Sequence, residues 1–413
     1  MTGRYKAYAE YKDSGVEWVG SIPTHWGLKK LKYLAPLIGE KATEKTNPIA
    51  LEHIQSWTGK LISSDSTFEG DGTKFKAGDI LFGKLRPYLA KVYLTKADGE
   101  AIGDFHVMRP ISNSYGKFLK SLMLTKDYIA TVDASTYGAK MPRASWDFTS
   151  NIQLPFCSEV EAEKIANFLD HETSKIDTLI DKQEKLIELL KEKRQAVISH
   201  AVTKGLNPHV PMKDSGVEWL GDVPEHWQIV KLSYFLKLLS GDGITSNLIE
   251  SEGKYPVMGG NGFRGYTSTY NCDGDYALIG RQGALCGNIN IAKGKFFASE
   301  HAVVVYPHKE FNLTFLSEFL RFMNLGQYSV SAAQPGISVE RINGLKIVIP
   351  PLAEQELIGD FIDRNIHRFE ELTLKSESMI MMLKERKAAL ISAAVTGKID
   401  VRDWQEPTYQ EGR

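Results

Sequence analysis

A stretch of the chain without proline or glycine dominates the pattern of apolar and polar positions. It runs from residue 159 to about residue 202 and permits a helix of about forty residues, roughly 60 Å long at ~1.5 Å per residue. Apolar residues recur along it at alternating steps of four and three residues, which is the spacing of a coiled-coil seam. The apolar stations are Ile165, Leu169, Ile176, Leu179, Leu186, Leu190 and Val197, and Glu172, Gln183 and Lys193 occupy polar stations of the same stripe.

The same stripe recurs 193 positions later in the chain. Two seams with the same spacing and the same interruptions favour an antiparallel coiled coil whose helices are related by a pseudo-two-fold axis. Polar residues within such a seam would fix its register, and with it the spacing of the attached domains. The alternative is that each stripe packs only on its own domain. The second seam comprises Ile358, Ile362, Phe369, Leu372, Met379, Leu383 and Leu390, with Asn365, Ser376 and Arg386 at its polar stations.

The segments outside these helices consist of short apolar runs broken by Gly, Pro, Asn and Asp. Residues 302–306 and 345–349 are such runs, and residues 117–131 and 314–324 have helical character. Each segment is therefore predicted to be a mixed α+β domain, and the length of 413 residues suits two of them. The expected division is a first domain at 1–158, a first long helix at 159–206, a second domain at 207–353, a second long helix at 354–400 and a tail at 401–413.

An internal duplication relates the two halves of the chain. The heptapeptide Lys-Asp-Ser-Gly-Val-Glu-Trp at residues 12–18 recurs 201 positions later, and Pro-x-His-Trp follows it in both copies. A second block, at residues 191–203, recurs 193 positions later and ends on Ile-Ser-x-Ala-Val-Thr in both copies. A repeat of this length indicates duplication of a whole domain unit and not a solenoid. Between the blocks the copies diverge, so we expect them to share a scaffold but not a surface.

The composition is that of a globular protein, with 42% apolar and 24% charged residues and a net charge of −1. The charge is uneven, because residues 74–143 hold twelve Lys and Arg against six Asp and Glu, a net charge of +6. Such a basic region is typical of a nucleic-acid interface. No apolar run approaches eighteen residues and no signal peptide is evident, so a cytosolic location is expected. Three cysteines without a close pair argue against a disulfide framework and against a cysteine-based zinc site.

The duplicated blocks, taken together, resemble the specificity subunit of type I restriction-modification enzymes. The features that carry the resemblance are the Lys-Asp-Ser-Gly-Val-Glu-Trp and Pro-x-His-Trp opening, the Pro then Glu-x-Glu start of each long helix, and the Ile-Ser-x-Ala-Val-Thr exit. Their order and their duplication are more specific than any short motif. The resemblance covers the chain from about Lys12 to Asp400.

This resemblance implies two target-recognition domains that alternate with two spacer helices, each domain reading one half of a split DNA site. It implies that the chain has no catalytic site of its own. Its partners would be double-stranded DNA, two methyltransferase subunits, and restriction and translocase subunits. S-adenosylmethionine, Mg and ATP would be bound by those partner subunits only. The DNA sequence that is read does not transfer from the family.

In the first domain, two segments are candidates for DNA contact. Lys84, Arg86 and Tyr88 lie beside Gly83 and Pro87, which predicts a turn that presents two cations and an aromatic ring to a groove. The alternative is a strand end with solvated cations. The second segment, residues 137–145, carries Lys140 and Arg143 and aligns with residues 331–338, which carry Gln334 and Ser338 and resemble a loop placed against DNA in the family.

In the second domain, residues 258–266 are rich in glycine but lack the Gly-Lys-Ser/Thr ending of a phosphate-binding loop. We expect an exposed loop that presents Asn261, Arg264 and Tyr266 to DNA, and the alternative is a purely structural turn. Arg281 and Gln282 align near Lys84 and have side chains suited to guanine and adenine respectively.

Catalytic chemistry has little support in the sequence. We find no Asn/Asp-Pro-Pro-Tyr-like tetrapeptide and no glycine-rich turn after a plausible first strand, so methyl transfer has no evident site. Asp242, Glu252 and Lys254 have the order used by many metal-dependent nucleases, but their spacing alone is weak support. His25 and His226 each precede a tryptophan with no second ligand nearby, which favours structural packing. We therefore expect no catalytic residues and no metal site.

A protein–protein scaffold is the alternative function from a different class. Its two variable domains would bind other proteins, and the helices would act as the spacer. Salt dependence separates the two hypotheses, because contacts to several phosphates make the affinity fall steeply as salt rises.

Overall fold

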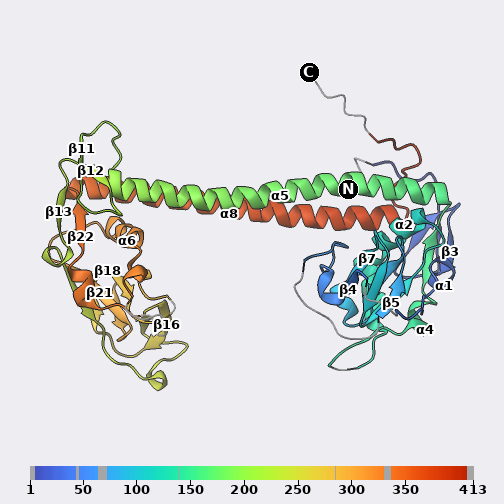
Figure 1. Ribbon diagram of the computed structural model, residues 1–413, viewed down its shortest axis with the longest axis horizontal. Helices are drawn as coiled ribbons and strands as arrows, with labels where there is room; N and C mark the ends of the chain where they lie inside the picture. Colours follow the sequence, from blue (N-terminus) through green and yellow to red (C-terminus); the bar gives the residue numbers. More distant parts are fainter. Residues whose placement is uncertain are drawn as a thin grey trace. The chain divides into compact units, whose positions relative to one another are not determined.

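The computed structural model describes residues 5–42, 46–63, 72–138, 140–283, 285–329 and 336–406 (Figure 1). The chain divides into two compact units. The first unit comprises residues 1–183 and 378–413, and the second comprises residues 184–377. Each unit therefore contains one domain and part of each of the two long helices.

The first domain is built from short strands and, among its described residues, four helices. Its three-stranded sheets have the orders β4-β8-β5 and β7-β6-β9, and two further strand pairs are β1-β2 and β3-β10. The strands are β1 (Tyr11–Asp13), β2 (Ser21–Pro23), β3 (Gly27–Lys30), β4 (Pro48–Ala50), β5 (Gly72–Phe75), β6 (Ile80–Gly83), β7 (Val92–Leu94), β8 (Gly99–Ile102), β9 (Phe105–Met108) and β10 (Gln153–Phe156). The helices are α1 (Leu31–Leu34), α2 (Asn113–Met123), α3 (Lys126–Ala134) and α4 (Trp146–Thr149), with 3₁₀ turns η1 (Leu51–His53) and η2 (Pro87–Leu89).

The helical segment expected at residues 117–131 is two helices, α2 and α3. Thr125 separates them, since its Oγ1 donates to Leu122 O (2.7 Å) and accepts from Tyr128 N (3.4 Å). A threonine that caps a new helix in this way competes with continuation of the preceding one. Both helices then pack their apolar faces on the main core of the unit, which includes Phe118 and Tyr128.

The second domain has two four-stranded sheets, of orders β14-β21-β18-β19 and β16-β15-β20-β17, and the strand pairs β11-β12 and β13-β22. Its strands are β11 (Met212–Asp214), β12 (Asp222–Pro224), β13 (Gln228–Lys231), β14 (Leu236–Ser240), β15 (Tyr255–Gly259), β16 (Gly262–Thr267), β17 (Cys272–Asp273), β18 (Tyr276–Gly280), β19 (Ile289–Ala292), β20 (Lys295–Ala298), β21 (Ala302–Pro307) and β22 (Lys346–Ile349). Its helices are α6 (Leu313–Phe322) and α7 (Val339–Asn343), with 3₁₀ turns η3 (Leu232–Tyr234), η4 (Ser246–Leu248) and η5 (Leu325–Tyr328).

The duplication is visible in the strand pairing. The opening hairpin β1-β2 of the first unit has its counterpart in β11-β12 of the second. Strand β3 pairs antiparallel with β10 so that Lys30 faces Gln153, and β13 pairs with β22 so that Lys231 faces Lys346. These partners are related by the two offsets of the sequence repeat. The predicted fold class, two duplicated α+β domains with two long helices, is confirmed.

The two long helices are α5 (Glu159–Lys204) and α8 (Leu352–Val395). Each ends just before a glycine in the left-handed region, Gly205 (φ 75°) and Gly397 (φ 71°), which is a common way to terminate a helix. Gly359 lies inside α8, where a Cβ would collide with the side chain of Asn312, the N-cap of α6. The glycine therefore lets α8 approach the second domain closely.

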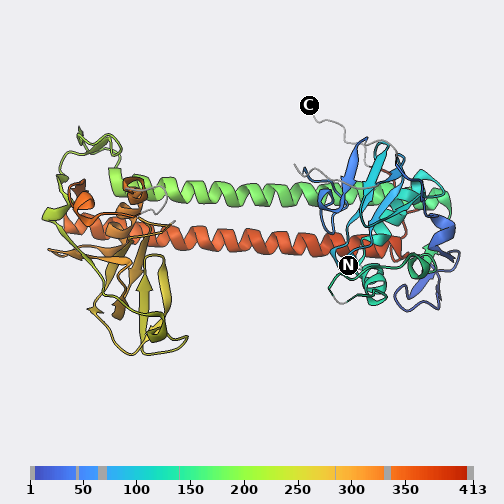
Figure 2. The ribbon, with the colours of Figure 1, turned by 60° about the horizontal axis from the view of Figure 1, so that its bottom comes forward.

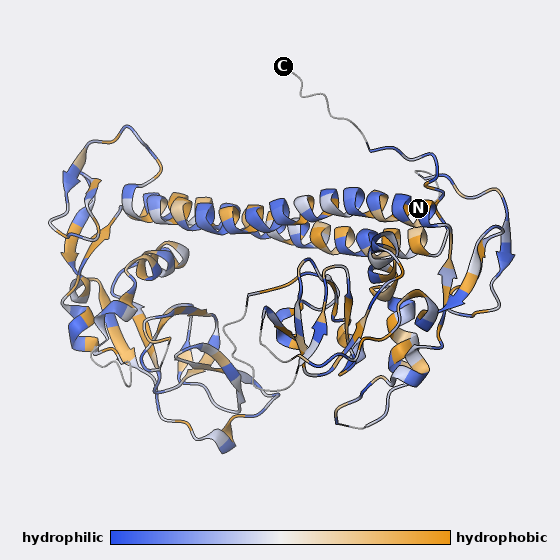
Figure 3. Ribbon diagram, turned by 45° about the vertical axis from the view of Figure 1, so that its right-hand side comes forward, coloured by the Kyte–Doolittle hydropathy of each residue, from blue (hydrophilic) through white to orange (hydrophobic). Residues whose placement is uncertain are grey.

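Within each unit the two helices lie side by side (Figures 1 and 2). The first half of α5 shares the core of the first unit with the last turns of α8, and the last turns of α5 share the core of the second unit with the first half of α8, so the pair is antiparallel in both. Hydrophilic and hydrophobic residues alternate along both helices (Figure 3). The buried apolar stations of the seam are Ile165, Leu169, Ile176, Leu190, Ile358, Ile362, Phe369, Leu383 and Leu390.

The seam opens near the middle of each helix. Leu179, Leu186, Leu372 and Met379 are exposed to between 38% and 47%, and Val197 is half-buried. Most of the buried stations belong to the core of one unit, whereas the exposed stations belong to neither core. The apolar pattern of the seam is therefore continuous in the sequence, but its burial is not. Among the described residues, no helix is long and apolar enough to cross a membrane.

Candidate nucleic-acid interface

The histidines of the duplicated opening bind the first turn of a long helix in each unit. His25 Nε2 lies 3.1 Å from Glu161 Oε2 on α5, and His226 Nε2 lies 2.7 Å from Glu354 Oε2 on α8. In each copy, one histidine–glutamate contact thus links the Pro-x-His-Trp motif to the Glu-x-Glu motif. These contacts attach each domain to its helix, as expected for structural packing.

The predicted turn of the first domain is formed at the end of β6. Arg86 has a left-handed backbone (φ 50°) and caps the 3₁₀ turn η2, with Pro87 at its first position. Arg86 is exposed, and Tyr88 is 44% exposed. Proline restricts its own φ and disfavours the right-handed helical conformation for the residue before it, and Arg86 adopts the left-handed conformation here.

The two candidate segments of the first domain lie side by side. Arg86 N donates to Pro142 O (2.8 Å), and Ala144 N donates to Lys84 O (2.9 Å). The structure therefore brings residues 84–88 and 140–145 together into one surface. We call this surface the first reading frame, where frame means the hydrogen-bonded backbone that presents the candidate side chains and not a frame of translation. Lys140 within it is exposed.

Asp104 interacts with two of the cationic side chains of the first reading frame. Asp104 accepts from Arg143 Nη2 at 3.0 Å and lies 3.8 Å from Lys84 Nζ. The hydrogen bond to Asp104 raises the pKa of Arg143 further. A carboxylate that holds two cations in place orders them before binding and competes with any phosphate for them. Sequence reasoning missed Asp104, since nothing in the local sequence links it to residue 143.

His106 lies beneath the same frame and was also missed. It is 5% exposed, its ring stacks on Phe82, and its Nε2 lies 3.2 Å from Ala144 O. The pKa of His106 is lowered to about 4, chiefly by burial and also by the charge of Lys84, against the opposing effect of the hydrogen bond to Ala144. The ring is therefore neutral near pH 7 and donates to the Ala144 carbonyl in the tautomer that carries hydrogen on Nε2.

The second domain has an equivalent frame. Ile337 N donates to Arg281 O (3.0 Å), and Gln282 forms an isolated bridge with Gly336. We call residues 281–282 and 336–338 the second reading frame. Ser338 precedes α7 as Ser145 precedes α4, so the alignment made from sequence agrees with the structure here. Gln334 lies outside the described residues.

The glycine-rich segment at residues 258–266 is the β15-β16 hairpin. Asn261 at its turn is exposed and accepts from Asn288 Nδ2 (3.3 Å). The turn lies against the second reading frame, because a Cβ on Gly260 would be 3.5 Å from Arg281 N. Arg264 is exposed and Tyr266 half-buried on the outgoing strand. The segment is thus an exposed hairpin that adds polar side chains beside Arg281.

The residues with nuclease-like order are engaged elsewhere. Asp242 Oδ2 accepts from Asn271 Nδ2 (2.9 Å), and Lys254 Nζ lies over the ring of Tyr255. Within the part of the chain that the structure describes, no group of three or more His, Cys, Asp or Glu side chains is placed to hold a metal ion.

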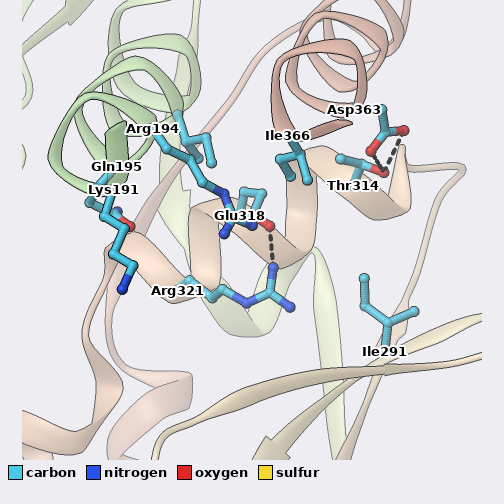
Figure 4. A pocket seen from close by; sticks show the side chains of 10 residues that line it. Lys191, Arg194, Gln195, Ile291, Thr314, Glu318, Arg321, Asp363 and Ile366 are labelled. Atoms are coloured by element: carbon cyan, nitrogen blue, oxygen red, sulfur yellow. Dashed lines mark hydrogen bonds and ion pairs between the residues drawn. The ribbon is translucent and has the colours of Figure 1, made fainter. Parts of the chain in front are cut away.

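A polar cavity of about 540 Å³ lies in the second unit, between α5, α8 and α6. Arg194 and Glu318 face each other across it, and Glu318 is bound to Arg321 (Figure 4). Arg194 Nε is buried without a hydrogen-bond partner among the described residues. None of the candidate DNA residues lines the cavity, so it is separate from the second reading frame. Its lining is Lys191, Arg194, Gln195, Ile198, Ile291, Thr314, Glu318, Arg321, Asp363 and Ile366.

Comparison with known proteins gives consistent relatives. Residues 224–377 match the family described as "Type I restriction modification DNA specificity domain". The chain is 41% identical over 146 residues, 34% of this chain and 35% of the relative, to the type I restriction enzyme EcoprrI specificity subunit of Escherichia coli. It is 24% identical over 426 residues, 93% of this chain and 96% of the relative, to the putative type I restriction enzyme MjaX specificity subunit of Methanocaldococcus jannaschii.

A solved structure has a similar fold. It is described as "Structural basis underlying complex assembly and conformational transition of the type I R-M system", and the similarity has a TM-score of 0.70 at 18% identity, over 92% of this chain and 99% of the other. The match to the first relative covers about a third of that protein's length, whereas the second relative and the solved structure are matched over nearly their whole lengths.

Proposed function

We propose that the chain is a specificity subunit of a type I restriction-modification system, as its matches to the DNA specificity domain and to curated specificity subunits support, and that it recognises a split DNA site. Each domain reads one half of the site. The chain itself carries out no chemistry, and methylation and cleavage belong to its partners.

The observation that supports this proposal is the pair of reading frames. In both units a backbone hydrogen bond joins the strand end to the later loop, from Ala144 N to Lys84 O and from Ile337 N to Arg281 O. The frames are alike, but the side chains they present differ. Arginine and lysine suit guanine edges and phosphates, and glutamine suits adenine. Two equivalent frames with different side chains are what two different half-sites require.

The partners follow from the same proposal. Two methyltransferase subunits dock on the chain, and restriction and translocase subunits join them. Exposed side chains on the long helices support this docking: Leu179 and Met379 are exposed in the first unit, and Leu186 and Leu372 in the second. Apolar side chains of this kind are buried in protein interfaces. S-adenosylmethionine, Mg and ATP are bound by the partner subunits only, and the assembly works in the cytosol.

The test compares matched variants of the two frames. The full chain is produced in cells with its partner subunits, and modified bases are mapped across the genome. The double substitution Lys84→Ala with Arg86→Ala should relax or abolish recognition of one half-site, and Arg281→Ala with Gln282→Ala should affect the other half. Equal damage to both halves by either variant contradicts one domain per half-site.

Salt dependence tests DNA binding against the scaffold alternative. A protein that contacts six to ten phosphates loses about 10³- to 10⁵-fold in affinity between 50 and 200 mM salt. We expect a steep fall of this kind for the full chain with its methyltransferase partners on DNA. Absence of DNA binding, together with retained binding of proteins by both domains, would favour the scaffold.

A further inference from the structure

A tight loop at residues 55–60 of the first unit presents an exposed tryptophan. Gln55 N donates to Lys60 O (2.9 Å) and closes the loop. Trp57 is 44% exposed and has a φ of 65°. The left-handed region is costly for a bulky residue, and such strain persists only where the surroundings enforce it, often at functional sites. The loop thus holds a large apolar side chain in solvent at a cost in backbone energy.

The loop is braced against three parts of the first unit. Trp57 N donates to Ala90 O (3.2 Å) at the end of η2. A Cβ on Gly59 would be 2.6 Å from Lys120 Cε, so the loop lies directly on α2. Lys60 Nζ lies 3.0 Å from Asp177 Oδ2 on α5. A loop anchored at three points presents its tip in one conformation, which reduces the ordering cost of binding.

Backbone strain is concentrated at this place. The described residues include five non-glycine residues with positive φ, and three of them are joined here. Arg86 and Ala90 cap the two ends of η2, and Trp57 is hydrogen-bonded to Ala90. Between these caps lies Tyr88, which belongs to the first reading frame. The strained positions are Asn47, Trp57, Arg86, Ala90 and Asn324.

We infer that Trp57 is an apolar base contact of the first recognition domain, next to Arg86 and Tyr88. The inference rests on the proposed function and extends it to a residue that the basic-residue pattern does not reveal. A rigid indole packs on base edges and thymine methyl groups in a groove of the duplex without a charge of its own. The neighbouring cations supply the attraction to phosphate, and Trp57 adds contact to the bases of the first half-site.

The test measures binding of the full chain, with its methyltransferase partners, to a duplex that carries the mapped site. Trp57→Ala should weaken binding roughly 5- to 150-fold, the range for loss of one aromatic base contact, and Trp57→Phe should retain most of the affinity. The slope of affinity against salt should not change, because no phosphate contact is removed. DNA should quench the tryptophan fluorescence of the wild type more than that of Trp57→Phe.

Two controls separate a DNA contact from a folding defect. Trp57→Gly removes the ring and also relieves the positive φ, so its unfolding temperature should hold or rise while its DNA affinity falls. Tyr33→Ala removes another exposed aromatic, 58% exposed on α1, which Figure 1 places at the opposite side of the unit from β4. Its DNA affinity should be that of the wild type.

Several results would overturn the inference. Wild-type affinity of Trp57→Ala would exclude a base contact while leaving the proposed function intact. Loss of the methyltransferase subunits on purification of Trp57→Ala would make Trp57 a protein contact. A reduced salt slope in Trp57→Gly would show that the surrounding cations, and not the indole, are affected. Failure of the wild-type assembly to bind any DNA would remove both the inference and the proposed function.

Discussion

Protonation of His106 should destabilise the first domain as the pH falls. This side chain lies on β9 under the first reading frame and is 5% exposed. Burial lowers its pKa from 6.5 to about 4. The unfolded chain therefore takes up a proton on this residue at a higher pH than the folded chain does. The stability that neutral His106 contributes is fully present above pH 6.5 and is lost as the pH falls from 6.5 towards 4.

The size of the effect follows from the two pKa values. The difference between 6.5 and about 4 corresponds to roughly 3 kcal/mol over the whole window. Most of that pH window lies below pH 5.5, the lower pH of the comparison that follows. Between pH 7.5 and pH 5.5 this residue alone should lower the free energy of unfolding by about 1 kcal/mol, which is a measurable fraction of the stability of a domain.

Urea unfolding of the full chain at pH 7.5 and pH 5.5 measures this difference. The comparison is with His106→Gln, whose side-chain amide can still donate to the Ala144 carbonyl but does not titrate. The other nine histidines contribute equally to both proteins, so the wild type should lose about 1 kcal/mol more than the variant on acidification. Identical losses in the two proteins would refute the assignment of a buried neutral imidazole.

Two further predictions concern the long helices. Ile362→Asp places a carboxylate in the buried part of the seam and should lower the free energy of unfolding by about 3 kcal/mol or more. Leu186→Asp changes a position that is 41% exposed and should lower it by about 0.5 kcal/mol or less in the isolated chain. Urea unfolding measures both variants, and equal losses would contradict the difference in burial between the two positions. Asp177→Asn leaves Lys60 and Lys387 without their shared carboxylate and should lower the free energy of unfolding by about 1–2 kcal/mol. The control Glu370→Gln on α8 should lower it by about 0.5 kcal/mol or less. Thermal unfolding compares the two, and a larger loss in the control would count against the bridge.

The long helices were predictable because their signal is periodic and local. The absence of proline and glycine from residue 159 to about residue 202 marked α5 to within two residues of its observed end at Lys204. The burial of the seam was not predictable in the same way. Leu186 and Leu190 occupy equivalent stations of one stripe, yet one is 41% exposed and the other 9% exposed. Periodicity shows which face of a helix is apolar, and it does not show what covers that face.

The reading frames were predictable in part. Turn residues and clustered cations marked residues 84–88 and 137–145 separately, because glycine, proline and charge act locally. That these segments are hydrogen-bonded to each other, and that Asp104 holds Arg143, depends on strand pairing between distant positions. The strained backbone that singles out Trp57 is a matter of its φ of 65°. Neither pairing nor φ can be obtained from the composition of a short segment.

For the proposed function, the two reading frames provide one scaffold for two different half-sites. The bonds that form each frame join backbone atoms, from Ala144 N to Lys84 O in one unit and from Ile337 N to Arg281 O in the other. A backbone bond of this kind does not depend on which side chains its residues carry. Lysine at one frame and arginine at the other therefore occupy equivalent places without altering the frame. Under the proposed function, substitution of the side chains that each frame presents changes the bases that are read, while the strand pairs and the histidine–glutamate contacts hold each domain on its helix.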